Sequence, residues 1–483
     1  MKKAIASIVI LLNVIAAQAK IDIEPIFSDN MVVKQSSDIL FWGKAKPSSK
    51  VTIQTTWSDK IISTKSDKTG KWEMYVPTPA ADLRHHEVKI SDGEEIVLKN
   101  VVLGEVWLSS GQSNMGMPMA GFKNLPVLGA NEAIANCTDD NIRLFKVKLQ
   151  PSATERETMQ EPNGWMQCNP NNLPDFSAVS YFFGRQLRAT LGIPVGMIDA
   201  SLGGSKIQAW MSREALKDFP EEIIPATDAD FKVAAVTPTT LYNGAIHPIT
   251  GYTISGMIWY QGCRNRFEYE KYPAMFKAMV TDYRASWESD FPVYLTQIAP
   301  NEFPEGYNSA FIREALVKCT EVVPGTGIAI LSDAGNRPNV HSPHKQVVGE
   351  RLAYQALNKT YGFTGIKCDG PAYDSMTVNG NRAIISFNNV LNGNKGGLTS
   401  YNEEIVDFEV AGEDKVFHPA KAIINRFCQV EVWSDKVSVP VAVRYGFKSW
   451  FDGNLYNTMG LPASSFRTDD WNEVGWDERP DKR

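Results

Sequence analysis

The stretch Val101-Val-Leu-Gly-Glu-Val-Trp-Leu-Ser-Ser-Gly-Gln-Ser-Asn114 joins a mostly apolar strand to a tight turn. A strand with so few polar positions is typical of a parallel sheet that is covered on both faces. Gly111 allows a sharp turn, and Ser113 follows it where the strand ends. Because open parallel sheets bind their ligands beyond the carboxyl ends of the strands, this stretch predicts both an α/β fold and the place of its site.

Strands of the same character recur downstream and alternate with helical patterns. Ser177–Leu191 carries apolar residues at helical spacing, with Ser177 as N-cap. Another helix is expected directly after His341, with Ser342 as cap and Pro343 at the first helical position. This alternation predicts a parallel sheet with helices on both faces. The further strands are expected at 195–200, 254–260, 293–298 and 328–332, and a further helix at 307–323.

The flanking regions have a different rhythm. Residues 20–100 contain short alternating strands separated by turns, at 50–57, 71–76 and 86–90, which predict a β-sandwich-like domain. Beyond residue 361 the helical signal fades, and strands are expected at 382–387, 405–410 and 437–445. The predicted organisation is therefore 1–19, 20–100, 101–360 and 361–483, with the α/β domain third in this order.

The composition is that of an ordinary globular protein. The chain has 483 residues, and 49 Lys and Arg against 55 Asp and Glu give a formal net charge of −6. This balance gives no support to nucleic-acid binding, which normally shows as clustered basic residues. The six Cys have no C-x₂-C spacing, so buried thiols are expected at most positions, with one disulfide as the open alternative.

The first 19 residues have the pattern of a signal peptide. Lys2 and Lys3 precede an apolar run at 4–17, and Ala17-Gln18-Ala19 is a small-residue cleavage motif. The run is shorter than the roughly 20 residues that span a membrane. We therefore expect an exported protein, periplasmic or extracellular, without a membrane span.

Residues that suit acyl transfer follow successive strands. Ser113 is a candidate nucleophile, and the Gly203–Gly204 turn after the second strand can point a backbone N–H into a site. Asn265, after the third strand, can donate an amide hydrogen bond to an oxyanion. His341, after the last strand, can take the proton of Ser113. Each signal is weak alone, but together they supply a nucleophile, a base and oxyanion donors at one edge of a sheet.

These blocks resemble the four motifs of the Ser-Gly-Asn-His hydrolases, and the match is closer still to the sialate O-acetylesterase family. The most specific stretch is 104–115, and supporting matches extend over nearly the whole chain after residue 19. The resemblance implies a three-layer, flavodoxin-like α/β domain with a β-sandwich-like region before it and a β-rich region after it. The supporting matches are at 27–32, 70–72, 176–184, 241–244, 258–262, 341–353, 408–412, 440–445, 454–457, 460–463 and 466–469.

The resemblance also implies a reaction. It implies removal of O-acetyl groups from sialic acids through an acetyl-enzyme intermediate, without a metal or another cofactor. Ser113 is then the nucleophile and His341 the base. Gly204 and Asn265, together with the N–H of Ser113, are the implied oxyanion donors. Neighbouring residues that are expected to bind substrate are Gln112, Gln261 and Arg264.

The loop that ends in Asn265 departs from the family pattern. It reads Gly262-Cys-Arg-Asn265, where the family usually has Gly-Glu-Ser-Asn after Trp-Tyr-Gln. A carboxylate is lost and a cation is gained. Arg264 has two interpretations, a structural ion pair or a bidentate partner for a substrate carboxylate. Cys263 also has two interpretations, an alternative nucleophile or a side chain that only packs in the interior, and packing is favoured.

The third member of a triad is also unusual. Many enzymes of this superfamily have Asp three residues before the histidine, where this chain has Pro338, and Asn339 lies two before. We expect Asp333 to reach His341 from the strand end, with a backbone carbonyl as the alternative. A metal site formed by His341 and His344 has no obvious third ligand and is disfavoured.

Three functions follow from these observations. The leading one is a secreted serine esterase that acts on O-acetylated sialic acids. The second is a deacetylase of acetyl-xylan or another polysaccharide, which uses the same chemistry in a different pocket. The third is a catalytically weakened, carbohydrate-binding homologue, suggested by the altered loop, the missing Asp and twelve Trp. The sequence leaves the acetyl position and the oligomeric state open.

Overall fold

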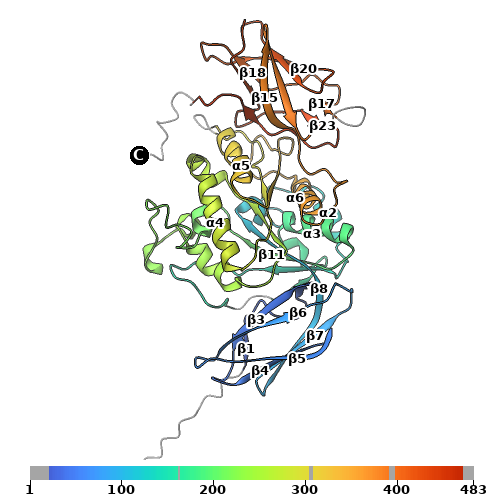
Figure 1. The fold of residues 1–483 in the computed structure, drawn as a ribbon, viewed down its shortest axis with the longest axis vertical. Helices are drawn as coiled ribbons and strands as arrows, with labels where there is room; N and C mark the ends of the chain where they lie inside the picture. The colour runs from blue at the N-terminus through green and yellow to red at the C-terminus, as the bar shows by residue number, and fades with distance from the viewer. Residues whose placement is uncertain (1–20, 161–163, 304–307, 391–396, 472–483) are drawn as a thin grey trace, which may run out of the picture.

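One long strand, β8 (Glu95–Gly111), connects the first two parts of the molecule (Figure 1). The computed structural model describes residues 21–160, 164–303, 308–390 and 397–471, so the expected signal peptide at 1–19 lies outside the described residues. The first half of β8 pairs antiparallel with β7 (His86–Ser91). Its second half pairs parallel with β11 (Val195–Ser201) and β12 (Gly256–Tyr260). The domain limit that we expected near residue 100 therefore falls within a continuous strand.

The second half of β8 lies in the middle of the predicted parallel sheet. The strand order is β10-β9-β11-β8-β12-β13-β14, and only β10 runs antiparallel to its neighbour. Gly111 at the end of β8 is in register with Ser201 of β11 and Tyr260 of β12. The three loops that follow these strands therefore start at the same level of the sheet. The other strands are β9 (Ile142–Lys146), β10 (Met166–Gln167), β13 (Val293–Thr296) and β14 (Thr326–Ala329).

Helices cover both faces of this sheet, which confirms the three-layer prediction. Trp107 of β8 packs against Phe183 of α3 (Ala178–Leu191) on one face. On the other face Tyr272, which begins α4 (Tyr272–Ser286), accepts a hydrogen bond from Trp259 of β12. Helix α6 (Lys345–Lys359) packs beside α3, and α5 (Ala310–Val322) packs beside α4.

The helix ends agree with the sequence in one case and differ in another. Ser177 caps α3 as expected, because its Oγ accepts the Ser180 N–H at 3.1 Å. Helix α6 begins at Lys345, later than we predicted, because the Ser342 hydroxyl donates to the Ala334 carbonyl and holds this residue in the preceding loop. The last strand of the sheet likewise ends at Ala329, earlier than the predicted 332.

The N-terminal region has the sandwich-like arrangement that the sequence predicts. One sheet has the order β1-β3-β6. The other has the order β5-β4-β7, and β7 pairs with the first half of β8. Its core is continuous with that of the α/β region, so the two regions share buried side chains. Its strands are β1 (Asp22–Ile23), β2 (Val32–Lys34), β3 (Asp38–Lys44), β4 (Lys50–Thr55), β5 (Ser58–Lys65) and β6 (Lys71–Pro77).

The C-terminal region is β-rich and has a core of its own. It docks on the α/β region through Arg313 of α5, a fully buried cation whose guanidinium donates to the Gly446 carbonyl at 3.2 Å and to Ser465 at 3.1 Å. Its strands are β15 (Ala372–Asn379), β16 (Arg382–Asn388), β17 (Leu398–Thr399), β18 (Phe408–Ala411), β19 (His418–Pro419), β20 (Lys421–Ile424), β21 (Val430–Trp433), β22 (Ala442–Tyr445), β23 (Tyr456–Asn457) and β24 (Phe466–Arg467).

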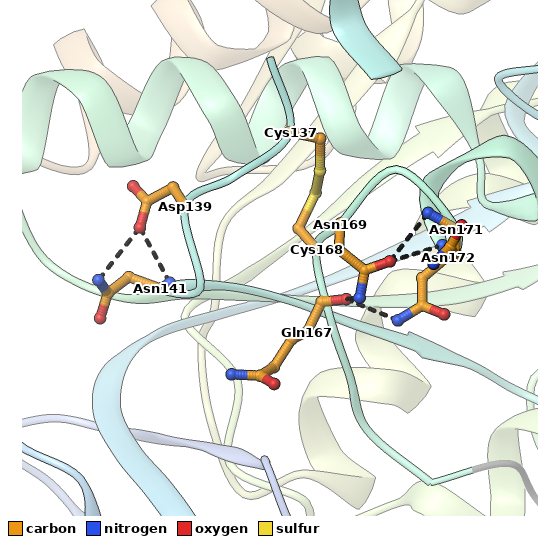
Figure 2. Close-up of a disulfide and its surroundings, with 8 residues drawn as sticks. All are labelled: Cys137, Asp139, Asn141, Gln167, Cys168, Asn169, Asn171 and Asn172. Atoms are coloured by element: carbon orange, nitrogen blue, oxygen red, sulfur yellow. Dashed lines mark hydrogen bonds between the residues drawn. A yellow bond between two sulfur atoms is a disulfide. The ribbon is translucent and has the colours of Figure 1, made fainter. Parts of the chain in front are cut away.

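Two of the six cysteines form a disulfide. Cys137, just after α2 (Ala130–Ala135), is bonded to Cys168, which follows β10, with their Cα atoms 5.9 Å apart (Figure 2). The bridge fastens the segment after α2 to the edge of the parallel sheet. The other four cysteines are free. Across the described ranges, no helix has the length and apolar character needed to cross a bilayer.

Candidate active site

The Ser113 hydroxyl and the His341 imidazole meet at the carboxyl end of the sheet. Ser113 begins the short helix α1 (Ser113–Gly116) directly after β8, and its Oγ lies 2.7 Å from Nε2 of His341. Gly111 makes this turn possible, because its φ is +135° and a Cβ there would lie 2.3 Å from the Tyr260 carbonyl oxygen. The structure thus joins two residues that are 228 positions apart, as the sequence predicts.

The environment of His341 favours the neutral imidazole that a general base requires. Burial lowers the pKa of His341, and the positive charge of Lys345 lowers it further. Its backbone N–H donates to Asn339 Oδ1 at 2.9 Å, so Asn339 fixes the backbone rather than the ring. The ring of Phe122, which is 36% exposed, packs edge-on against the imidazole at 5.3 Å between centroids.

Asp333, expected as the third member of a triad, is turned to another partner. Its two oxygens accept from the Arg351 guanidinium at 2.6 and 2.7 Å. Arg351, on α6, also donates to the Ile330 carbonyl at 2.8 Å, which fixes it beside the end of β14. Among the residues that the structure describes, no carboxylate is hydrogen-bonded to the His341 ring. The placement of Asp333 therefore contradicts its predicted role, because the arginine occupies both of its oxygens.

The Gly203–Gly204 turn borders the nucleophile. A Cβ on Gly203 would lie 3.5 Å from the Cβ of Ser113. Gly204 is exposed, has a φ of +69°, and has no heavy atom within 4 Å of its Cβ position. The turn is thus open on the side of Gly204, which is compatible with a backbone N–H that serves a bound oxyanion. That role remains a prediction.

Asn265 does not have the freedom that its predicted role requires. The side chain is fully buried, and its amide nitrogen donates to Gln208 Oε1 and Glu268 Oε2, both at 2.8 Å. Its oxygen accepts from the Ile207 N–H at 2.9 Å and from Gln261 Nε2 at 2.8 Å. Both amide hydrogens are therefore engaged within the protein. In this arrangement Asn265 has no hydrogen left to offer an oxyanion, which corrects the prediction.

Gln261, expected to bind substrate, belongs to the same buried network. Its amide nitrogen donates to the Ser205 carbonyl at 2.9 Å as well as to Asn265, and its oxygen accepts from the Tyr272 hydroxyl at 2.6 Å. Because the side chain is fully buried and all its hydrogen-bonding groups are used, Gln261 holds the loop in place. The prediction that it contacts substrate is wrong for this structure.

Gln112, the residue before Ser113, and Cys263 are buried and contact each other. Gln112 is 4% exposed, and its Oε1 accepts the backbone N–H of Arg264 at 3.4 Å. Burial raises the pKa of the Cys263 thiol to about 11, although a hydrogen bond with Gln112 and nearby positive charges partly oppose the shift. A thiol with so high a pKa is a poor nucleophile near neutral pH, which favours packing over catalysis for Cys263.

Arg264 is the exposed cation of this loop. Its backbone is tied to Gln112, the neighbour of Ser113, while its side chain reaches solvent. In the described part of the chain no carboxylate forms an ion pair with it, so the structural ion pair considered from the sequence is not found. The alternative, a substrate carboxylate, stays a prediction.

Two buried residues at the site were not identified from the sequence as functional. Asn114 is 1% exposed, and its Nδ2 donates to the Val340 carbonyl at 3.0 Å. Lys345 is fully buried, and burial lowers its pKa to about 7. Asn114 stands within the Gly-Gln-Ser-Asn motif and was a visible candidate. Nothing in the sequence around Lys345 indicates that the fold would bury it.

Comparisons with known proteins agree on the class of enzyme. The family model of carbohydrate esterases described as sialic acid-specific acetylesterase matches residues 103–358, more than half of the chain. Sialate O-acetylesterase from Homo sapiens is 26% identical over 397 residues, covering 74% of this chain and 75% of that protein. The Mus musculus sialate O-acetylesterase is 26% identical over 523 residues, covering 91% and 93%.

A solved structure extends the likeness to the whole fold. A carbohydrate acetylesterase from Xanthomonas citri superposes with a TM-score of 0.84 and is 32% identical, covering 94% of this chain and 100% of that one. The similarity therefore includes the flanking β regions as well as the α/β domain. It supports the Ser-Gly-Asn-His hydrolase fold that the sequence motifs predict.

Proposed function

Because this chain belongs to the sialic acid-specific acetylesterase family of carbohydrate esterases and is a carboxylic ester hydrolase, we propose that it removes acetyl groups from O-acetylated sialic acids. The observation that carries the proposal is the 2.7 Å contact between Ser113 Oγ and His341 Nε2. A hydroxyl paired with a neutral imidazole at the end of a parallel sheet is a nucleophile with its base.

The proposed reaction has two half-reactions. Ser113 Oγ attacks the acetyl carbonyl while His341 Nε2 takes its proton, and the tetrahedral intermediate expels the sugar oxygen, which receives that proton from His341. The acetyl group is then an ester on Ser113. A water molecule, deprotonated by His341, attacks this ester, and acetate leaves as Ser113 recovers its proton. The backbone N–H groups of Gly204 and Ser113 are the proposed donors to the oxyanion.

Arg264 is the proposed selector of an acidic sugar. A sialic acid is an anion, and the chain has a formal net charge of −6, so the overall field does not attract it. The Arg264 guanidinium is exposed, lies in a loop tied to the neighbour of Ser113, and has no carboxylate partner in the described chain. It can therefore attract the carboxylate of a sialic acid. Arginine also suits bidentate recognition of a carboxylate.

A second candidate substrate is an acetylated neutral polysaccharide. It is supported by the likeness to the Xanthomonas citri protein, which is described as a carbohydrate acetylesterase without mention of sialic acid and is 32% identical to this chain. The chemistry at Ser113 and His341 would be unchanged. The two substrates differ in charge, so replacing Arg264 is expected to affect the sialic acid substrate and not the neutral one.

An acetate-release assay tests these alternatives. The wild-type protein and Ser113→Ala are incubated side by side with O-acetylated N-acetylneuraminic acid and with acetyl-xylan. We expect release from the sialic acid by the wild type alone. Faster release from acetyl-xylan would favour the second candidate. Equal release by both proteins would contradict Ser113 as the nucleophile. Glycan binding without acetate release would favour a binding homologue.

Export is a further part of the proposal. Residues 1–19 have the pattern of a signal peptide, and the Cys137–Cys168 disulfide suits an oxidising compartment. N-terminal sequencing of the protein recovered from the periplasm or the medium is expected to begin near Lys20. Recovery only in the reducing cytosol, with residues 1–19 still attached, would contradict export.

A further inference from the structure

Lys345 is a buried cation for which the proposed reaction has no stated use. It is the first residue of α6, has 0% exposure, and lies four positions after His341. Its Nζ donates to Asn114 Oδ1 and lies 5.6 Å from the centroid of the Tyr260 ring. Within the described ranges no carboxylate pairs with it. Lysine is almost never fully buried unless it is paired, so this placement calls for a function.

Asn114 connects Lys345 to the loop that carries His341. It is adjacent to Ser113 in the chain, and its Oδ1 accepts from Lys345 while its Nδ2 donates to the Val340 carbonyl at 3.0 Å. Val340 immediately precedes His341. The path Lys345–Asn114–Val340 therefore joins the helix of the nucleophile to the loop of the base, because Asn114 is the neighbour of Ser113 and Val340 is the neighbour of His341.

We infer that Lys345, acting through Asn114, is a positioning residue that holds the His341 loop against Ser113 and places a positive charge near the pair. This inference rests on the proposed function of Ser113 and His341. It accounts for how the backbone of the His341 loop is fixed at Val340, in addition to the bond between Asn339 and the His341 N–H.

The charge has a defined consequence for the base. The titratable groups around Lys345 are the Cys263 thiol and the Tyr260 phenol from β12 and its loop, and His341 from the loop before α6. Burial raises the pKa values of both Cys263 and Tyr260, so both stay neutral near pH 7. Lys345 is mostly protonated below its pKa of about 7, where His341 titrates. The positive charge therefore keeps His341 deprotonated to lower pH.

The first experiment measures the pKa of His341 by NMR of its imidazole Cε1–H signal, assigned by comparison with His341→Gln. In Lys345→Met we expect this pKa to rise by about one unit, because a positive charge nearby is removed. Lys359→Met, a matched change on the same helix at a lysine paired with Asp369, is expected to leave it unchanged. An unchanged His341 pKa in Lys345→Met would overturn the inference.

The second experiment tests positioning. Lys345→Met and Asn114→Leu are each expected to lower kcat about tenfold with KM nearly constant, and the acid limb of the pH profile of kcat/KM should move upward in Lys345→Met. Because the residues act in one path, the double variant should lose little more than either single variant. Fully additive losses, or effects on KM alone, would contradict a shared path.

Failure of the proposed function and failure of this inference are distinguishable. The NMR titration needs no turnover, so it tests the inference even if the wild type releases no acetate. Absence of acetate release would contradict only the esterase proposal. Should Lys345→Met fail to fold, Lys345→Gln, which removes the charge and keeps a donor, takes its place with the same expected pKa rise and the same contradicting result.

Discussion

The loops after β11 and β12 leave the sheet at the same level, yet they differ in what they leave free. The loop after β12 contains Asn265 and Gln261, whose side-chain amide groups are all hydrogen-bonded to other groups of the protein. The loop after β11 contains Gly204, which is exposed and open. A residue's position at a strand end thus indicates where a site lies, whereas the availability of its side chain depends on partners from other loops.

The largest effect is expected at His341, which belongs to neither of these two loops but contacts the nucleophile directly. Replacing His341 by Gln removes the base, and we expect kcat for acetate release to fall by about 10³-fold. Because burial and Lys345 lower the pKa of His341, wild-type kcat/KM should decline only below the ordinary histidine pKa of 6.5, as the imidazole becomes protonated. A pH profile checks both statements. A decline that begins well above pH 6.5 would contradict the assignment of His341 as base.

The next effect contrasts the two loops directly. Asn265→Ala should lower the free energy of unfolding by about 3 kcal/mol, because several buried hydrogen-bonding groups lose their partner. Gly204→Ala should cost only about 1 kcal/mol, from its left-handed backbone. Urea denaturation of both variants measures these changes. If Asn265→Ala kept full stability and lost kcat instead, Asn265 would be an oxyanion donor after all.

Asp333 offers a test of the missing triad acid. Asp333→Asn weakens the ion pair with Arg351, so we expect a stability loss of about 2 kcal/mol and a change in kcat of less than tenfold. The kinetic comparison is informative because loss of a true triad Asp lowers kcat by about 10⁴-fold. A loss of that size in this variant would restore Asp333 to the triad.

The smallest effect is expected at Arg264. Arg264→Gln should raise KM for an O-acetylated sialic acid about tenfold and leave KM for a neutral aryl acetate unchanged, since only the first substrate has a carboxylate. Arg426→Gln, an exposed arginine in the C-terminal β region, serves as the matched control. Equal effects of Arg264→Gln on both substrates would show that it acts on the loop rather than on the carboxylate.

Much of the fold was predictable because it depends on local patterns. The apolar strands, the Ser177 cap and the turn at Gly111 are set by residues near one another in sequence. Helix α4 was missed although its signal was present, with Pro273 in the first turn and buried Tyr272, Met275, Met279 and Tyr283 at helical spacing.

The site was predictable in part. The contact between Ser113 and His341 could be expected because their chemistry and strand-end positions are visible in the sequence, and their catalytic roles stay a proposal. The engagement of Asn265 was not, because its partners Gln208 and Glu268 reach it only in the folded chain. The same holds for Asp333, since the sequence does not show that Arg351 on α6 faces the end of β14. Burial of Lys345 is likewise a property of the assembled layers.

The central claim, that Ser113 carries the acetyl group during turnover, is tested most directly by peptide mass spectrometry of the wild-type protein after rapid acid quenching with an O-acetylated sialic acid. The account predicts one acetyl group on the peptide that contains Ser113 and none in Ser113→Ala. Acetate release with the acetyl group on Cys263, or with no covalent intermediate under conditions in which deacylation is slow, would contradict it.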